Sequence, residues 1–219
     1  MSLSVVILSR NADNLEVCVA AVRRHEPDLR IIVVDDGLDR VPDGVTVVPG
    51  EKPFCYARNA NIGIRAAARD DVVLLNDDAL LESPGGFTVM QSAAASDPAL
   101  GIIGGTCNNV GNPNQFRGGV GLRPESRMVC FVCVLIPRRT IERVGLLDER
   151  FVGYGMDDDD YSLRVRHAGL RIAVHDDCFV DHAQLESSYR GAAGAGGDFR
   201  PNLELFKQKW GHDNWGRPA

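Results

Sequence analysis

The chain has 219 residues, of which 44% are hydrophobic and 25% are charged, a profile typical of one globular domain with a large core. No stretch approaches the roughly 20 apolar residues that a membrane-spanning helix needs. The formal net charge of -6 argues against broad electrostatic binding of nucleic acid and leaves only a local basic groove open. The start, MSLSVVILSRN, lacks the basic segment of a signal peptide, so we expect a cytoplasmic protein whose six cysteines are reduced.

The first half of the chain alternates strand-like and helix-like segments. Continuous apolar, β-branched runs predict buried strands at residues 3–8, 30–37, 45–48, 71–78 and 101–105. Apolar residues at helical spacing predict the helices between them, at residues 14–25, 56–69 and 84–96. This alternation predicts an α/β fold with a single Rossmann-like, mostly parallel sheet, covered by helices on both faces and connected by right-handed crossovers.

The second half of the chain has a less regular pattern. It predicts a loop or hairpin at residues 111–127, a long strand at 128–137, a short helix at 138–145, a helix at 157–168, a strand-like stretch before His182 and an amphipathic terminal helix at 202–211. Residues 189–201 contain GAAGAGG, whose small side chains cannot hold one conformation by packing. This segment is either a lid that orders over bound substrate, which we predict, or a slack connector.

Polar side chains follow three of the predicted strands at the point where each strand ends. They are Ser9, Arg10 and Asn11, then Asp35 and Asp36, and then Asn76, Asp77 and Asp78. In doubly wound sheets, ligands bind outside the carboxyl ends of the strands. Surface acids would account for one such end, whereas two acidic ends and a polar third predict a binding cleft.

Four consecutive aspartates, residues 157–160, open one of the predicted helices. Like charges at this spacing repel one another, although the free N–H groups and dipole of a helix N-terminus favour acids in the first turn. Asp160 and Arg164 are four residues apart and form an expected ion pair. Asp158 lies on the stripe that faces the body of the protein, so we expect it to be partly buried, and we expect Asp159 to be solvated. The alternative is an over-acidic surface cap.

Seven short motifs carry a family resemblance that extends over nearly the whole chain. They are VVILSRN, IIVVDDG, FCYARNANIGI, VVLLNDD, VLIPRRTIERVGLLDERF, DDDDYSLRVRHAG and VDHA. In this order they resemble glycosyltransferase family 2, and especially its bacterial rhamnosyltransferase-like members. The resemblance implies a single domain of the GT-A fold, with a nucleotide-sugar-binding half at residues 1–105. Residues 106–219 would form the acceptor-binding and catalytic half, with a smaller β region and the C-terminal helix.

The resemblance implies a hexosyltransferase that moves a sugar from a nucleoside-diphosphate sugar to an acceptor hydroxyl with inversion. Asp78 matches the family position that binds a divalent metal, and His182 matches a late histidine that often completes the metal site. The implied cofactor is Mn²⁺ or Mg²⁺, which would neutralise the leaving diphosphate. A histidine after a strand is also a common plain hydrogen-bonding residue. Asn76 stands where many members have the first acid of an Asp-X-Asp motif.

The remaining donor contacts follow from the same resemblance. Asp77 matches an acid that contacts the donor ribose or the metal shell. Asp35 and Asp36 match a position that reaches the nucleobase and ribose, beside Ser9 and Arg10, whose guanidinium can stack on the base. Arg58 in YARNANIG matches an arginine near the donor and can pair with the diphosphate, or it is an ordinary helix-surface charge.

The resemblance also gives roles to two of the four aspartates. Asp158 matches the catalytic base, which takes the proton of the acceptor hydroxyl in the transition state. Asp157 stands where the family usually has glutamate and is expected to support it. The acceptor implied by the family is a polysaccharide, a glycolipid, a protein or another modified polymer. Two other classes stay open, a nucleotidyltransferase or other nucleotide-sugar enzyme and a non-catalytic carbohydrate- or partner-binding module.

Overall fold

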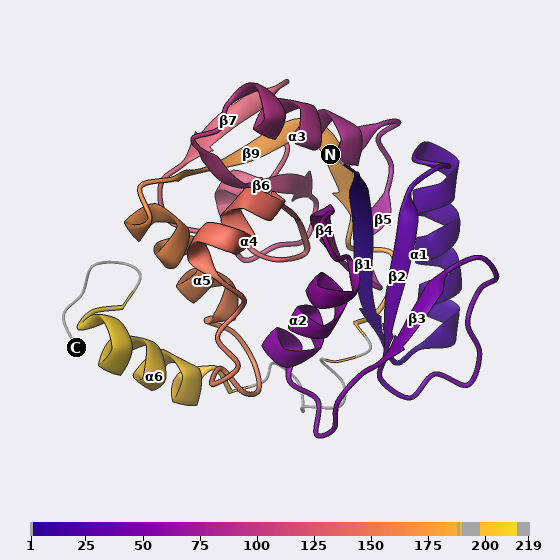
Figure 1. Ribbon diagram of the computed structural model, residues 1–219, viewed down its shortest axis with the longest axis horizontal. Helices are drawn as coiled ribbons and strands as arrows, with labels where there is room; N and C mark the ends of the chain where they lie inside the picture. The colour runs from indigo at the N-terminus through magenta and orange to yellow at the C-terminus, as the bar shows by residue number, and fades with distance from the viewer. Residues whose placement is uncertain (1, 188, 190–197, 214–219) are drawn as a thin grey trace.

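The structure is a computed structural model that describes residues 2–187, 189 and 198–213. It contains a nine-stranded sheet in the order β3-β2-β1-β4-β8-β6-β9-β5, and β7 also pairs with β9 (Figure 1). The strands are β1 (Leu3–Ser9), β2 (Arg30–Asp35), β3 (Thr46–Pro49), β4 (Asp71–Asn76), β5 (Leu80–Leu81), β6 (Leu100–Cys107), β7 (Leu122–Glu125), β8 (Cys133–Ile136) and β9 (Arg171–Asp181). The helices are α1 (Ala12–His25), α2 (Tyr56–Ala66), α3 (Gly86–Ser96), α4 (Arg138–Val144), α5 (Asp157–His167), α6 (Arg200–Trp210) and the 3-10 turn η1 (Pro113–Gln115).

The sheet is mostly parallel, as the alternation of strands and helices predicts. β1, β2, β3, β4, β6 and β9 run in one direction, and β5, β7 and β8 oppose them. β8 lies between β4 and β6, so the second half of the sequence contributes strands to the sheet begun by the first. Because parallel strands end at the same edge, the segments that follow β1, β2, β4, β6 and β9 meet there.

Helices cover both faces of the sheet, as predicted. Alternate residues of a strand point to opposite faces, so Val5 and Ile7 of β1 pack with α1 and α3, whereas Val6 and Leu8 pack with α2, α4 and α5. Figure 1 shows α1 and α2 on opposite sides of the parallel strands. Each such buried side chain contributes about 1.5–3 kcal/mol, and packing on both faces fixes the position of the strand ends.

The C-terminal helix α6 is held against α5 by a buried carboxylate. Asp160 accepts hydrogen bonds from Arg164 Nε at 3.0 Å and Trp210 Nε1 at 2.9 Å, and pairs with Lys209 Nζ at 2.6 Å. The predicted ion pair between Asp160 and Arg164 is thus confirmed. Apolar contacts complete the junction, through a small core of Phe151, Met156, Leu163 and Phe206. Asp160 is fully buried, so α6 packs against one side of α5, the helix that carries the four aspartates.

Substitution of Trp210 by phenylalanine should lower the free energy of unfolding by about 1.5–3 kcal/mol, the usual contribution of a hydrogen bond to a charged group. The ring is kept, and the Nε1–H donor to Asp160 is lost. Urea denaturation followed by circular dichroism measures the change. The matched control on the same helix is Lys207→Met, which removes an exposed pair with Glu204 and should cost less than about 0.5 kcal/mol. Equal effects of the two variants would contradict the anchoring role.

The strand predicted at residues 128–137 is shorter in the structure, because side chains bind the backbone of its first part. The backbone N–H of Val129 donates to Ser162 Oγ at 3.1 Å, and that of Cys130 donates to Gln115 Oε1 at 2.6 Å. These bonds replace a strand ladder, so β8 starts only at Cys133.

The long strand β9 was predicted only at its end, because its middle reads as polar. Asp176 is fully buried there, and its carboxylate pairs with the Arg123 side chain on β7. The segment at residues 111–127, expected to be a loop or hairpin, contains β7. This strand pairs with the distant β9 rather than with a neighbour in sequence.

Within the described part of the chain, no helix combines the length and the apolar character needed to cross a bilayer. All six cysteines are free thiols, and five of them are buried. Burial raises the pKa of Cys107 to about 12, so this thiol is protonated and unreactive at neutral pH.

Candidate functional site

The carboxyl edge of the sheet gathers most of the predicted site residues. Arg10 follows β1, Asp36 follows β2, Asp77 and Asp78 follow β4, and His182 follows β9. These residues are far apart in the sequence, and the parallel strands bring them to one edge. The structure therefore brings these five residues to the edge of the sheet where the sequence predicts a binding cleft.

Asp78 and His182 form a buried pair with a defined tautomer. His182 Nε2 lies 3.1 Å from Asp78 Oδ1, and both side chains are buried. The other ring nitrogen, Nδ1, lies 2.6 Å from the carbonyl oxygen of Asn109, which can only accept, so Nδ1 carries a proton. A neutral ring then turns the Nε2 lone pair toward the carboxylate oxygen. Two acceptors at this distance need something between them that both can bind, either a shared proton or a bound cation.

The spacing of this pair suits a hard divalent cation. Adjacent ligands of an octahedral ion bound at about 2.1 Å lie about 3 Å apart, close to the 3.1 Å between Asp78 Oδ1 and His182 Nε2. Among the described residues, no three His, Cys, Asp or Glu side chains gather into a complete metal site. Two protein ligands fit an ion whose other positions are filled by phosphate oxygens and water, as is usual for Mg²⁺ with phosphorylated substrates.

Two asparagines hold His182 in place, and the sequence reading missed both. The backbone N–H of His182 donates to Asn108 Oδ1 at 2.8 Å, and Asn109 Nδ2 donates to the His182 carbonyl oxygen at 3.2 Å. They follow β6 at the edge where the other site residues lie. The rule used for the other strand ends would have found them, had residues 101–105 been extended to the true end of the strand.

Ser9 and Asp77 form a second buried pair at this edge. The Ser9 hydroxyl donates to Asp77 Oδ2 at 2.6 Å, and both residues are nearly inaccessible to solvent. A hydroxyl bond to a carboxylate is short and strong, so Ser9 fixes the orientation of Asp77. Ser9 therefore contacts the Asp77 carboxylate from within the protein.

Asp35 and Asp36 differ in their surroundings. Asp35 Oδ1 accepts backbone hydrogen bonds from Gly37 and Leu38, each at 2.7 Å, which closes the turn after β2. The Asp36 side chain is buried and pairs with the Lys52 ammonium, while the Lys52 side chain is 61% exposed. In the described residues, neither Asp36 carboxylate oxygen accepts a hydrogen bond of normal geometry. Asp36 is therefore the acid of the two that can accept from a ligand.

Arg10 lines a surface pocket of about 480 Å³ at the ends of β1 and β2. The pocket is polar, and its other lining residues are Asn11, Ala12, Asp13, Gly37, Asp39 and Arg40. Arg58 lies on α2, where its Nε is 3.6 Å from Glu51 Oε2 and 3.7 Å from Glu149 Oε2. Arg58 is thus held by two acids in this structure.

The N-terminus of α5 presents two partly buried aspartates, Asp157 and Asp158. The helix starts directly after Met156, which has a left-handed φ of 72°. Burial, followed by the charge of the neighbouring acids, raises the pKa of Asp158 well above its usual range. Burial also raises the pKa of Asp157, to about 6, against the opposing effect of backbone hydrogen bonds. Burial, followed by the charges of Asp157 and Asp158, raises the pKa of Tyr56, the first residue of α2, so the two aspartates lie near the start of α2.

The expected burial of the four aspartates is correct in part. Asp158 is partly buried, as predicted, whereas the prediction of a solvated Asp159 is wrong, since this residue is only 7% exposed. Burial, followed by the charges of Asp158 and Asp159, raises the pKa of the Cys130 thiol in the segment before β8. The sequence does not indicate that these acids lie near Cys130, because residues 128–132 read as part of a strand.

Replacement of Asp157 by asparagine should stabilise the protein at pH 8 by about 1–3 kcal/mol, estimated from a pKa shift of about two units. The folded protein holds a proton on Asp157 up to about pH 6, while the unfolded chain releases it near its ordinary pKa. Stability therefore falls as the pH rises through this window, and the neutral amide avoids the loss. Thermal melting at pH 4 and pH 8 tests this. The exposed control Asp28→Asn should shift neither melt, and an equal gain at both pH values would contradict the titration.

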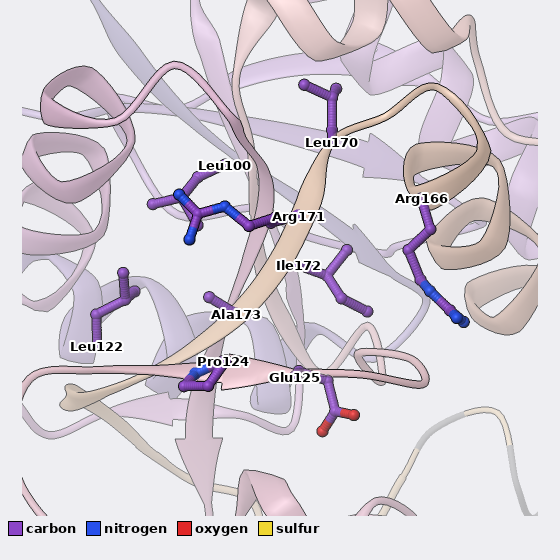
Figure 2. Close-up of a pocket in the computed structure, with 9 residues that line it drawn as sticks. All are labelled: Leu100, Leu122, Pro124, Glu125, Arg166, Leu170, Arg171, Ile172 and Ala173. Carbon is purple, nitrogen blue, oxygen red and sulfur yellow. The ribbon is translucent and has the colours of Figure 1, made fainter.

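A separate pocket of about 450 Å³ lies away from the site, at the amino ends of β6 and β9 (Figure 2). Leu100 begins β6 and Arg171 begins β9, so this end of the sheet is opposite to the one that carries Asp78 and His182. Figure 2 shows the aliphatic side chains along the strands, with Arg166 contributed by α5. The pocket is therefore not part of the candidate site.

The predicted lid at residues 189–201 lies mostly outside the described residues, because its glycine- and alanine-rich part falls at 190–197. Tyr189 is described, and so is the end of the segment, where α6 begins at Arg200.

Two solved structures are similar in fold to this chain. The crystal structure of GalNAc-T7 with UDP, GalNAc and Mn²⁺ has a TM-score of 0.69 at 14% identity, and the match covers 83% of this chain and 43% of that one. The mannosyltransferase PcManGT from Pyrobaculum calidifontis, in complex with GDP-Man and Mn²⁺, has a TM-score of 0.67 at 19% identity, over 87% of this chain and 59% of that one. The fold is therefore GT-A-like, as expected.

Comparison of sequences gives the family. A curated relative, described as "Uncharacterized protein y4gI" of Sinorhizobium fredii (strain NBRC 101917 / NGR234), is 25% identical over 264 residues, which cover 99% of this chain and 28% of that protein. The chain thus spans less than two thirds of this relative and of both solved chains. The family model of glycosyl transferase family 2 matches residues 4–126, more than half of the chain. The chain therefore belongs to glycosyl transferase family 2.

Proposed function

We propose that this chain is the donor-binding and catalytic domain of a metal-dependent, inverting glycosyltransferase that uses a nucleoside-diphosphate sugar. The observation that carries the proposal is the buried pair of Asp78 and His182, whose facing acceptor atoms lie at the separation of two ligands of one cation. The two GT-A-like structures were solved with Mn²⁺ and with UDP or GDP-Man. Their ligands support the same class of donor here.

Asp78 and His182 would hold Mn²⁺ or Mg²⁺ through Oδ1 and Nε2. When bound, the ion supplies Lewis-acid neutralisation of the leaving diphosphate. The carbonyl oxygen of Asn109 accepts from Nδ1 of His182 and thereby directs Nε2, rather than Nδ1, toward Asp78. Two protein ligands leave the other coordination positions to the donor, which couples donor binding to the cation.

The donor would lie along the carboxyl edge from Arg10 to Asp78. Asp36 accepts a hydrogen bond from the nucleobase, and the Arg10 guanidinium packs on the base. Asp77, held by Ser9, accepts from the ribose hydroxyls. Asp35 and Ser9 then support the donor site from behind, through the turn after β2 and through the Asp77 carboxylate.

Asp158 would act as the catalytic base at the N-terminus of α5. Its carboxylate takes the proton from the acceptor hydroxyl while that oxygen forms a bond to the anomeric carbon. The bond between this carbon and the diphosphate oxygen breaks on the opposite face, which inverts the configuration. A raised pKa suits this role because it brings a weakly basic carboxylate closer to neutral pH. The charge of the neighbouring Asp157 would help to keep the pKa of Asp158 raised.

Arg58 would reach the diphosphate after exchanging its present partners. Its contacts with Glu51 and Glu149 are longer than 3.5 Å, so they are weak pairs that a phosphate can replace with bidentate bonds. Residues 1–105 would bind the donor, and residues 106–219 would bind the acceptor, which the family's range leaves as a polysaccharide, a glycolipid, a protein or another polymer.

Calorimetric titration tests the donor site without requiring an acceptor. One of UDP, GDP or dTDP should bind the wild-type chain in the presence of Mn²⁺ and should lose most of its affinity in excess chelator. His182→Phe should weaken Mn²⁺ binding more than the 10–100-fold typical of losing an outer-shell partner. The control His212→Phe changes a histidine that bonds locally to the Asp213 carbonyl and should bind as the wild type does. Binding that is indifferent to Mn²⁺ and to His182 would contradict the proposal.

A further inference from the structure

Tyr189 lies on the residues proposed to bind the nucleobase. Its ring stacks on Phe54 with the centroids 4.1 Å apart and an angle of 22° between the planes. The Arg10 guanidinium carbon lies over the same ring, 5.9 Å from its centroid. A flat ring packed on an aromatic face and an arginine is also the arrangement that a bound base adopts.

The polar end of Tyr189 points into the same site. Its hydroxyl oxygen is buried, and burial together with the charges of Asp36 and Asp77 raises its pKa. Tyr189 therefore lies beside both acids at its hydroxyl end and against Phe54 and Arg10 at its ring. The side chain resembles a nucleobase in being flat, in stacking on an aromatic ring and in having a polar group at its edge.

We propose that Tyr189 occupies the nucleobase position of the donor site when no donor is bound, and that Phe54 is the surface on which the base stacks once Tyr189 has left. The inference rests on the proposed donor site and adds two residues to it. Tyr189 is then a reversible competitor of the nucleotide. Phe54 is a binding residue that neither the family motif nor the strand-end rule assigns.

The hydrogen bonding shows why a nucleotide can displace this side chain. The Tyr189 hydroxyl is close enough to Asp36 for a side-chain hydrogen bond to contribute to its raised pKa, but the contact lies outside regular hydrogen-bond geometry. A base N–H directed at Asp36 would supply a better aligned donor and would keep the stacking on Phe54. Exchange of the tyrosine for a base therefore replaces a poorly aligned contact by a regular hydrogen bond without losing the aromatic contact. The apparent affinity for nucleotide is reduced by the fraction of molecules in which Tyr189 occupies the site.

Two variants have opposite expected effects on nucleotide affinity. Tyr189→Ala removes the competitor, so the nucleoside diphosphate that binds best with Mn²⁺ should bind about 3- to 10-fold more tightly. Phe54→Leu keeps an apolar side chain without the ring and should bind about tenfold more weakly. The matched controls are Tyr154→Ala and Phe116→Leu, which change exposed aromatic residues and should leave the affinity unchanged. Weaker binding by Tyr189→Ala would mean that Tyr189 contacts the bound nucleotide, which overturns the inference.

A direct measurement follows Tyr189 itself. The chain has four tyrosines, so 3-fluorotyrosine labelling gives a simple ¹⁹F spectrum in which Tyr189→Phe identifies one signal. Titration with UDP, GDP and dTDP plus Mn²⁺ should shift this signal in proportion to bound nucleotide. A saturating nucleotide that leaves the signal in place would overturn the inference while the proposed function stands. If no nucleotide binds either the wild type or Tyr189→Ala, both the inference and the proposed function are overturned.

Discussion

Replacement of Asp158 by asparagine should slow sugar transfer at least ~10²-fold, the lower end of what a positioned base contributes. The amide keeps the size of the side chain at the start of α5 and cannot take a proton. Binding of nucleoside diphosphate should be unchanged, because the proposed donor contacts lie at the ends of β1, β2 and β4. The control Glu142→Gln makes the same change at an exposed position on α4 and should keep full activity.

The pH profile separates a base from a purely structural acid. Burial and the neighbouring charges raise the pKa of Asp158, so the wild-type rate should fall on the acidic side at a pH above the ordinary aspartate range. The residual rate of Asp158→Asn should lack this acidic limb. A variant that loses activity while keeping the wild-type limb would show that Asp158 supports the fold of α5 and that another group takes the proton.

Replacement of Asp78 by alanine should abolish metal-dependent transfer while leaving the fold intact. The variant loses one of the two proposed protein ligands, the carboxylate that faces Nε2 of His182. Circular dichroism and thermal melting should show a folded protein, and Mn²⁺ titration followed by electron paramagnetic resonance should show weaker binding. Asp177→Ala is the control, since this aspartate of β9 has a 45% exposed side chain and pairs with His175 rather than with His182. Full turnover by Asp78→Ala, or by wild type in excess chelator, would contradict the metal assignment.

The sheet and its site edge could be predicted from the sequence because the signal is local. Runs such as LSVVIL and DVVLLN are apolar and β-branched, and they stop on polar residues. A strand buried on both faces needs such a run, and the chain must turn back into solvent where it ends. The positions of Asp36, Asp77 and Asp78 follow directly from these ends.

The parts that could not be predicted depend on contacts between distant residues. Asn109 orients His182 across 73 residues of sequence through a backbone carbonyl, which no side-chain pattern records. Asp159 is buried although its motif predicts an exposed acid, and the segment before β8 reads as strand until the hydrogen bonds from its backbone N–H groups to Ser162 and Gln115 are seen. Ser9 reads as a ligand contact, although its hydroxyl is committed to Asp77. In each case a tertiary hydrogen bond decides what a local motif leaves open.

Tyr189 shows how little of a proposed role the sequence can specify. It begins the segment predicted to be a lid, and the glycine- and alanine-rich run beside it gives that residue no role of its own. Its contacts with Phe54 and Arg10, residues more than a hundred positions earlier, connect it to the proposed donor site.

Use of a metal-bound nucleoside-diphosphate sugar as the donor can be measured without knowing the acceptor. The measurement is the release of nucleoside diphosphate from a panel of UDP-, GDP- and dTDP-sugars, with Mn²⁺ and with excess chelator. We expect that at least one donor gives release that depends on Mn²⁺ and disappears in the Asp78→Ala variant. Release at the same rate in chelator, or Mn²⁺-dependent release from none of the donors, would contradict it.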